Sequence, residues 1–305
     1  MRLALIVAAI CLAPLFSALQ PPKQQPPPQQ QPPPTRPLSP PSSQSDSTPP
    51  RAYLGFDAND YPGDAALPAL RKTFSFAGYW LNPPPGAKTN SWTGTRPALL
   101  QNNFGFLVLF NGRIESQLQP PVVPAQLGSA DADLAIQTAR REGFPAHTII
   151  YLDQEEGGRM LPVQIDYLYS WIQRLNSSEF SAGVYCSGMK AKEGKGQFII
   201  TADDIHERTA AKSFFVYNDA CPPSPGCVYQ KNPPPPAASG VAYASVWQFA
   251  QSPRRHEFTK NCSSTYNRDG NCYPPATSAT AGASLSPILL DLDSATSPDP
   301  SHGRP

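Results

Sequence analysis

Residues 148–158 read TIIYLDQEEGG, and this stretch decides how the rest of the chain is interpreted. An apolar run ends in Asp153, a second carboxyl follows at Glu155, and two glycines then permit a sharp turn. Side chains alternate along a strand, so Asp153 and Glu155 project to the same side where the extended backbone continues that far. The stretch is typical of a strand with carboxyls at its end, although an acidic helix cap or a solvated loop produces the same pattern.

Similar apolar runs on both sides of this stretch predict further strands. With the strand at 147–153, they cover residues 52–57, 74–80, 104–110, 180–186, 213–217 and 243–249. An eighth and weaker candidate lies near the C-terminus at 288–292.

Helical patterns lie between several of these strands. The clearest covers residues 162–176, where apolar side chains recur at helical spacing. A second covers residues 129–143 with Ser129 as its expected cap, and a third follows Thr201, with Asp204 placed for a capping box. Strands that alternate with helices predict a parallel sheet covered by helices. The number of strands predicts an α/β fold of the TIM-like (β/α) barrel type, modified or incomplete.

The first fifty residues are expected to lie outside the folded domain. Residues 1–19 combine one positive charge with an apolar run, which predicts a signal peptide cleaved after Ala18 or an uncleaved N-terminal anchor. Residues 20–50 are rich in Pro, Gln and Ser and predict a disordered linker, either a semi-rigid spacer or a plain leader. The barrel is assigned to 51–251, and 252–305 to an irregular C-terminal extension with a local disulfide and a disordered tail. Export predicts a secreted, periplasmic or cell-envelope protein.

Charge and composition exclude several classes of partner. The 305 residues include 39 prolines, carry a net charge of +1 and contain no basic block. No nucleic-acid partner is therefore expected, and membrane contact is expected only through the N-terminal segment. No Cys-x-x-Cys pair occurs and the four histidines are scattered, so no metal site is expected, and no other cofactor either. We expect a monomer.

Five cysteines lie beyond the apolar N-terminal run. Cys221 and Cys227 bracket one short loop and Cys262 and Cys272 bracket another, which predicts two local disulfides in an oxidising compartment. Cys186 ends an apolar run, and no histidine is well placed to activate it. We expect an inert thiol there rather than a nucleophile.

Two more carboxyls follow predicted strands. Asp57 ends the first strand and Asp219 follows the sixth. In a parallel barrel the carboxyl ends of the strands form the active-site rim, so Asp57, Asp219, Asp153 and Glu155 are expected to converge there. Carboxyls held close together cannot all ionise easily, and a protonated carboxyl beside an ionised one is the pair that glycosidic cleavage requires. For each residue taken alone, a turn-forming aspartate is the alternative.

Aromatic and amide side chains at other strand ends complete a sugar-binding pattern. Sugars present apolar faces and hydroxyl edges, which suit aromatic platforms and amide partners. With Asp219, the candidate substrate-binding residues are Tyr79, Asn111, Tyr185, Trp247 and Gln248. Core packing is the alternative for Tyr185 and Trp247.

Several short motifs follow one another in the order seen in a family of bacterial glycoside-hydrolase-like domains of unknown function. They are Tyr53-Leu-Gly-Phe-Asp57, Phe76-Ala-Gly-Tyr79, Ile150-Tyr-Leu-Asp153-Gln-Glu155, Gly183-Val-Tyr185 and Val246-Trp-Gln248. The chain resembles this family over residues 51–251. The family is in turn similar to the family 25 glycoside hydrolases, the lysozyme-type muramidases.

The resemblance implies a modified TIM-like barrel that acts on, or binds to, cell-wall glycan. It implies that Glu155 is the general acid. It also implies that Asp153 and Asp57 orient the acetamido group of the substrate or stabilise positive charge at the anomeric carbon. Two features depart from the lysozymes: Asn59 stands where they carry a serine, and Glu156 with its two following glycines is additional.

Three hypotheses about function follow. The first is a secreted hydrolase of peptidoglycan-type amino sugars that works by carboxylate acid catalysis. The second is a non-catalytic glycan-binding domain on a tether, and the third is a structural envelope protein. The sequence leaves open whether the chain is catalytically active, which glycan it meets and whether the outcome is retaining or inverting.

Overall fold

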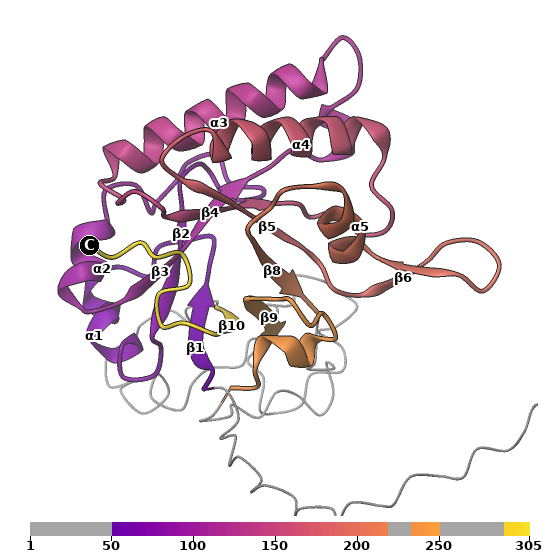
Figure 1. The fold of residues 1–305 in the computed structure, drawn as a ribbon. Helices are drawn as coiled ribbons and strands as arrows, with labels where there is room; N and C mark the ends of the chain where they lie inside the picture. The colour runs from indigo at the N-terminus through magenta and orange to yellow at the C-terminus, as the bar shows by residue number, and fades with distance from the viewer. Residues whose placement is uncertain (1–50, 219–232, 251–289) are drawn as a thin grey trace, which may run out of the picture. The chain divides into compact units, whose positions relative to one another are not determined.

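A closed barrel of eight strands forms the centre of the structure (Figure 1). The computed structural model describes residues 51–218, 233–250 and 290–305. Around the barrel the strand order is β1-β10-β9-β8-β5-β4-β3-β2. These strands are β1 (Tyr53–Asp57), β2 (Phe76–Trp80), β3 (Gly105–Asn111), β4 (Ile149–Asp153), β5 (Ser181–Ser187), β8 (Ser213–Tyr217), β9 (Val246–Ala250) and β10 (Asp291–Ala295). Neighbouring strands are parallel except that β10 is antiparallel to β1 and β9. The predicted fold class, a TIM-like barrel, is confirmed.

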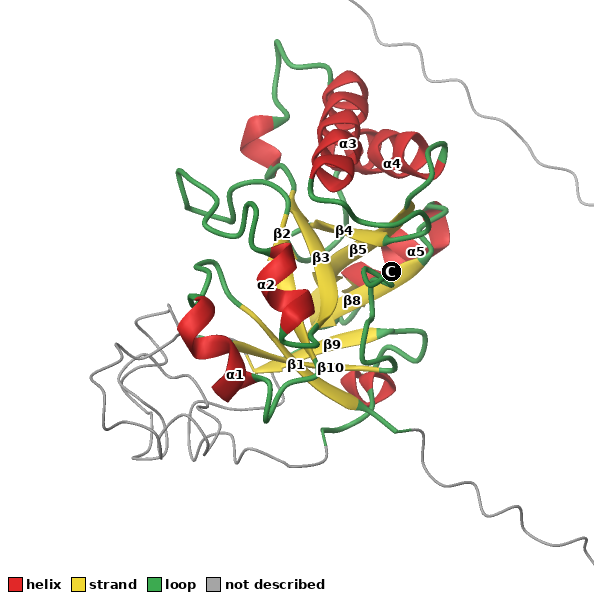
Figure 2. Ribbon diagram, turned by 90° about the vertical axis from the view of Figure 1, so that its left-hand side faces the viewer, coloured by secondary structure: helices red, strands yellow, loops and turns green. Residues whose placement is uncertain are grey.

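Helices cover the outside of the barrel (Figures 1 and 2). They are α1 (Leu67–Leu70), α2 (Arg96–Gln101), α3 (Pro124–Arg141), α4 (Pro162–Asn176) and α5 (Thr201–Arg208), with short 3-10 helices at Asp64–Ala66, Glu115–Gln117 and Pro236–Ser239. The two long helices, α3 and α4, pack side by side. A Cβ atom at Gly128 of α3 would lie 2.2 Å from the carbonyl oxygen of Tyr167 in α4, so only glycine permits this close approach.

The inside of the barrel is filled by side chains. A Cβ atom at Gly55 would lie 2.1 Å from the ring of Phe76, and one at Gly183 would lie 2.5 Å from the ring of Tyr151. The glycines therefore leave room for two large rings from neighbouring strands. The hydroxyls of Tyr151 and Ser213 form a hydrogen bond of 2.8 Å across the buried interior. The centre is thus filled by side chains, and in TIM-like barrel enzymes the active site lies at the mouth formed by the carboxyl ends of the strands.

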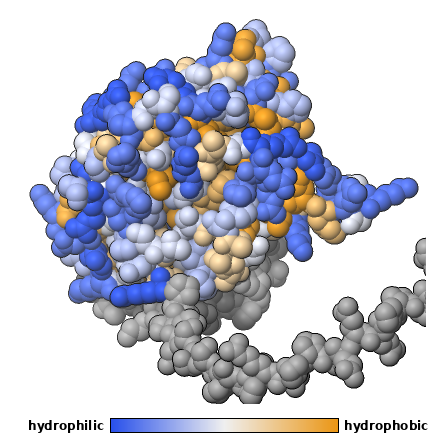
Figure 3. All heavy atoms as spheres, in the orientation of Figure 1, coloured by the Kyte–Doolittle hydropathy of each residue, from blue (hydrophilic) through white to orange (hydrophobic). Residues whose placement is uncertain are grey.

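A hairpin between β5 and α5 consists of β6 (Lys190–Lys192) and β7 (Phe198–Ile200), which the sequence did not predict. It extends away from the barrel (Figure 1). Met189 and Phe198 are exposed, and apolar side chains lie at the base of the hairpin while its tip is hydrophilic (Figure 3). No helix within the described ranges combines the length and the apolar character that crossing a membrane demands.

Residues 290–305 pack against the barrel, which corrects the prediction of a disordered tail at the end of the chain. The rest of the predicted extension, 252–289, lies outside the described residues. β10 closes the barrel between β1 and β9, three residues later than the strand predicted at 288–292 and in the antiparallel sense. Ser301 then bridges β3 and β4: its Oγ accepts from the Val108 amide (2.7 Å), and its carbonyl accepts from the Ile149 amide (2.8 Å). The predicted bounds were three residues early because Asp291 and Asp293 make the true strand look polar.

The start of α4 agrees with the prediction and α5 begins at Thr201, but α3 begins earlier than predicted and the expected cap of α5 is not formed. α3 begins at Pro124, and Ser129 lies inside the helix with its hydroxyl bonded to the carbonyl one turn back. Thr201 and Asp204 do not form a capping box, since the hydroxyl of Thr201 donates to the carbonyl of Gly158 (2.9 Å) and Asp204 accepts from the loop after β4. The side chains of Thr201 and Asp204 therefore form tertiary contacts instead of capping the helix.

Several predictions from the sequence lie outside the described residues. They are the signal peptide or anchor at 1–19, the linker at 20–50, Asp219 and the two disulfides between Cys221 and Cys227 and between Cys262 and Cys272.

Candidate active site

The carboxyl ends of the parallel strands meet at one end of the barrel and carry the predicted site residues. Cross-strand register places Asp153 of β4 beside Tyr185 of β5. It places Asp293 of β10 beside Gln248 of β9, and Asp57 of β1 beside Asp291 at the start of β10. Residues that are remote in sequence therefore share one mouth.

A hydrogen-bonded chain connects three strands at this mouth. The hydroxyl of Tyr185 donates to Oε1 of Gln248 (2.7 Å), and Nε2 of Gln248 donates to Oδ2 of Asp57 (2.7 Å). All three side chains are buried. The tyrosine fixes which way the amide points, and the amide then supplies a donor to the carboxyl, which favours its ionised form.

Burial raises the pKa of two carboxyls at the mouth. Asp57 and Asp153 are 5% and 4% exposed. Loss of solvation is the main reason why the pKa of Asp57 rises to about 6, against the lowering effect of the hydrogen bond from Gln248 and of the Asp293 side chain. The pKa of Asp153 rises well above its usual range, first through burial and then through the charges of Glu155 and Asp57. No hydrogen-bond donor among the described residues reaches Oδ1 of Asp153.

Glu155 is the exposed member of the group. It lies two residues beyond Asp153, and its charge raises the pKa of both Asp153 and Asp57. The hydroxyl of Tyr217, which ends β8, donates to the backbone carbonyl of Glu155 (3.2 Å) and ties the loop to the barrel. We refer to Asp57, Asp153 and Glu155 as the carboxyl cluster. The structure brings these three predicted residues together with Tyr185 and Gln248.

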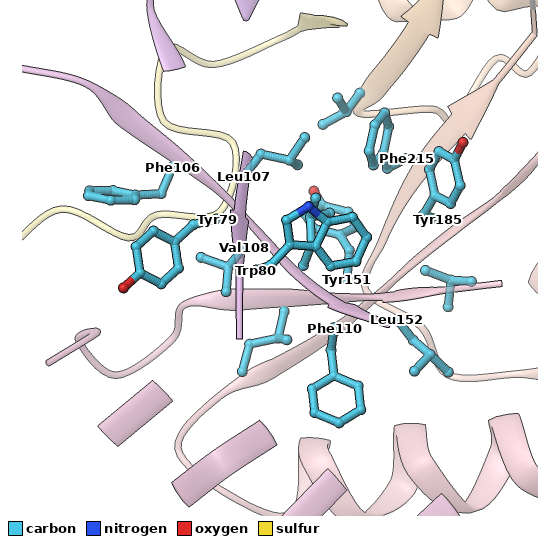
Figure 4. Packing of buried hydrophobic residues seen from close by; sticks show 14 of the residues in the cluster. Tyr79, Trp80, Phe106, Leu107, Val108, Phe110, Tyr151, Leu152, Tyr185 and Phe215 are labelled. Atoms are coloured by element: carbon cyan, nitrogen blue, oxygen red, sulfur yellow. The ribbon is translucent and has the colours of Figure 1, made fainter. Parts of the chain in front are cut away.

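Two aromatic residues predicted to bind substrate face the other way. Tyr79 and Trp80 lie on opposite sides of β2 (Figure 4). Tyr79 is fully buried behind the barrel, and its hydroxyl donates to the carboxyl of Glu142 (2.5 Å). Trp247 also lies in the outer layer, where its indole N–H donates to the carbonyl of Asn218 (2.9 Å). Both are core residues, because they are one position out of register with the inward face of their strands.

Asn111, the last residue of β3, is hydrogen-bonded to the loop that follows β2. Its amide donates to the carbonyl of Pro83 (2.9 Å), and its backbone N–H donates to the side chain of Asn82 (2.7 Å). Asn111 lies beside Asp153 in the register of β3 and β4, but its side-chain amide is engaged with Pro83. That it binds substrate stays a prediction.

The prediction from sequence missed two residues of the mouth. Trp80 faces inward, and its indole N–H donates to the carbonyl of Ala58, next to Asp57 (3.1 Å). Asp293 lies in β10, is completely buried, and shares the inner face with Asp57, since it pairs in register with Gly55, two residues before Asp57. Gly78 lies on the inner face of β2, where an added Cβ atom would lie 2.6 Å from Cβ of Asp57. Side chains alternate along a strand, so Trp80 shares the inner face with Gly78 and Tyr79 does not.

The described residues offer no obvious alternative chemistry. They contain no group of three His, Cys, Asp or Glu side chains arranged to hold a metal ion. Cys186 is buried, and burial raises the pKa of its thiol well above the ordinary range, which makes it a poor nucleophile. The carboxyl cluster is the group of interacting titratable side chains at the mouth of the barrel.

Comparison with known families supports the resemblance noted in the sequence. Residues 99–220 match the family described as "Rv2525c-like, glycoside hydrolase-like domain". The matched segment includes Asp153, Glu155 and Tyr185 but ends before Gln248. None of the curated proteins compared matches the chain.

Several solved structures are similar to the chain at low sequence identity. The catalytic domain of endolysin ply40 from bacteriophage P40 of Listeria monocytogenes is 10% identical, with a TM-score of 0.48 over 83% of this chain and 98% of that chain. The Mycobacterium tuberculosis Tat-secreted protein Rv2525c is 12% identical, with a TM-score of 0.46 over 80% and 95%. A family 25 glycosyl hydrolase from Bacillus anthracis is 9% identical, with a TM-score of 0.42 over 83% and 91%.

Proposed function

We propose that the chain is an exported glycoside hydrolase that cleaves cell-wall glycan of the peptidoglycan type. The observation that carries the proposal is the carboxyl cluster, in which two buried carboxyls with raised pKa values lie beside one exposed carboxyl at the mouth of the barrel. Cleavage of a glycosidic bond needs a proton donor to the leaving oxygen and an anionic group near the anomeric carbon. A cluster with one accessible and two buried carboxyls provides both kinds of group.

Each member of the cluster has a proposed role. Glu155, which solvent reaches, delivers the proton to the glycosidic oxygen. Asp57, which is ionised above a pKa of about 6 and held by Gln248, stabilises positive charge as it develops on the sugar ring. Asp153, which is buried beside Glu155, is assigned the orientation of the acetamido group of the substrate, the role that the family resemblance implies. Tyr185 positions Gln248 and does not contact the sugar in this scheme.

Replacement of Glu155 by glutamine tests the proposal. The amide keeps the size of the side chain but cannot deliver a proton, so release of soluble sugars from purified peptidoglycan should fall by on the order of 10²- to 10⁴-fold. The matched control is Asp166→Asn, which removes one carboxylate from the exposed surface of α4 and should leave the rate unchanged. Equal clearing of walls by wild type and Glu155→Gln would remove Glu155 from the mechanism.

A non-catalytic glycan-binding domain is the second candidate, and it is favoured by the residue after the first strand. Asn59 replaces the serine of the lysozymes, and its amide donates to the carbonyl of Pro85 (2.9 Å), where it links two loops instead of facing a substrate. A binding module should be retained on insoluble peptidoglycan both as wild type and as Glu155→Gln, without release of soluble sugar. If the wild type releases soluble sugar and Glu155→Gln does not, the chain is a hydrolase and not only a binding module.

A further inference from the structure

Asp293 occupies a position in the barrel that the proposed mechanism does not use. It lies in β10, between Gly55 of β1 and Gln248 of β9, and it is 0% exposed. A fully buried carboxyl is costly unless it is neutral or paired, because burial removes the water that stabilises its charge.

The contacts of this side chain are unusual. Among the described residues, no N–H or hydroxyl donates to either oxygen of Asp293. Another carboxyl, Asp57, lies on the same inner face: Gly55 pairs with Asp293 in the strand register, and Asp57 follows two residues later. Each of the two carboxyls shifts the pKa of the other. Two carboxyls can form a hydrogen bond with each other only if one of them carries a proton, since an ionised carboxylate only accepts. Because Asp293 is completely buried and neither of its oxygens has a donor, the pair of carboxyls is most stable when it holds one proton.

The surrounding groups determine which carboxyl holds that proton. Gln248 donates to Asp57, and Tyr185 fixes the orientation of that amide, so the ionised form of Asp57 is stabilised. Asp293 has no such donor, and the charges of Asp57 and of Asp291 raise its pKa further after the larger effect of burial. The proton therefore resides mainly on Asp293.

We propose that Asp293 is a positioning residue that keeps its proton at neutral pH and donates it in a hydrogen bond to Asp57. The two carboxyls then carry one negative charge in total. The hydrogen bond holds the Asp57 carboxylate at the mouth, next to the inward-facing Trp80, and limits the charge that the barrel must bury. The value of this arrangement for catalysis rests on the proposed function, whereas the shared proton itself does not.

Other charged groups face the same pair and must be considered in any titration. Asp153 and Glu155 approach from the β4 side, since the charge of Glu155 raises the pKa of Asp57 and the charge of Asp57 raises that of Asp153. Asp291 lies on the same strand as Asp293. Gln248 and the Tyr185 hydroxyl complete the surroundings from β9 and β5.

The test is a titration of the aspartate side-chain carboxyl carbons by NMR in the full chain, with wild type, Asp293→Asn and Asp293→Leu. In the wild type we expect the Asp293 signal to stay at its protonated position through pH 7 while Asp57 titrates near pH 6. In Asp293→Asn the asparagine keeps a donor toward Asp57, so the pKa of Asp57 should stay at or below its wild-type value. Leu removes the donor, so the pKa of Asp57 should rise clearly above its wild-type value.

Two results would overturn the proposal: titration of Asp293 near pH 4 in the wild type, or an unchanged pKa of Asp57 in the Leu variant. If the Leu variant does not fold, the wild-type titration of Asp293 still decides. Hydrolysis is measured separately. If the enzyme is active, the part of its pH–rate profile governed by Asp57 should move upward in the Leu variant and not in the Asn variant. If no hydrolysis occurs, the proposed function fails, while the NMR result stands.

Discussion

Removal of residues 297–305 is expected to prevent the barrel from reaching its folded state. This segment supplies partners to backbone groups of β3 and β4 that no neighbouring strand reaches. Asp299 accepts from the Phe106 amide (2.7 Å), and Ser301 binds the Phe106 carbonyl (2.9 Å) and the amides of Val108 and Ile149. Four backbone groups would lose their partners. At about 1–3 kcal/mol for each, the loss is comparable with the ~5–15 kcal/mol by which a typical domain is stable.

The deletion is compared with removal of Pro305 alone, which is exposed and should unfold like the wild type. A point variant gives a graded result: Asp299→Ala removes the acceptor for Phe106 and for two later amides, whereas Asp299→Asn keeps an oxygen there. We expect Asp299→Ala to lower the free energy of unfolding by about 1.5–3 kcal/mol and Asp299→Asn by less. Near-UV circular dichroism and a cooperative thermal transition in the deletion variant would show that the segment is dispensable.

Asp57→Asn is expected to stabilise the fold above pH 6 while it removes hydrolysis. The pKa of Asp57 is about 6 in the folded chain and 3.8 for an ordinary aspartate. Because the folded pKa is the higher one, the folded state binds the proton more tightly. The contribution of Asp57 to the stability of the fold is therefore complete below about pH 4 and is lost as the pH rises through 6. Asparagine cannot ionise, so it avoids a penalty that for this shift is on the order of 3 kcal/mol.

Thermal unfolding of wild type and Asp57→Asn at pH 4.5 and pH 8 measures this effect. The variant should gain on the order of 5–10 °C relative to wild type at pH 8 and much less at pH 4.5. The control Asp60→Asn changes an exposed carboxylate three residues further on and should show no pH-dependent difference. Sugar release by Asp57→Asn should fall by on the order of 10²-fold or more, since the anionic partner is lost. The same stability gain at both pH values would contradict the buried, ionised state assigned to Asp57.

The carboxyl cluster was predictable because it rests on two local rules. Apolar strands that end in Asp57 and Asp153 are visible as short patterns, and the carboxyl ends of parallel strands meet at one rim. Glu155 follows from the same stretch. These three residues needed no information about distant contacts beyond the fold class itself.

The aromatic residues were less predictable because each depends on strand parity. A shift of one residue exchanges the inner and outer faces of a strand, and the sequence of β2 is apolar at every position but one, so it does not reveal which face is which. Tyr79 was therefore chosen where Trp80 is the inward residue. The same difficulty applies to Trp247 and Gln248 in β9.

The sequence by itself determined that strands alternate with helices, that the strands are parallel and that carboxyls end two of them. It could do so because hydrophobic period and strand-end chemistry are local properties of the chain. Only the tertiary structure decided that β10 closes the barrel in the antiparallel sense, that Ser301 joins β3 to β4 and that Asp293 lies against Asp57. Each of these contacts joins residues more than 150 positions apart. Their formation depends on backbone groups and space that other strands leave unfilled, which no local pattern records.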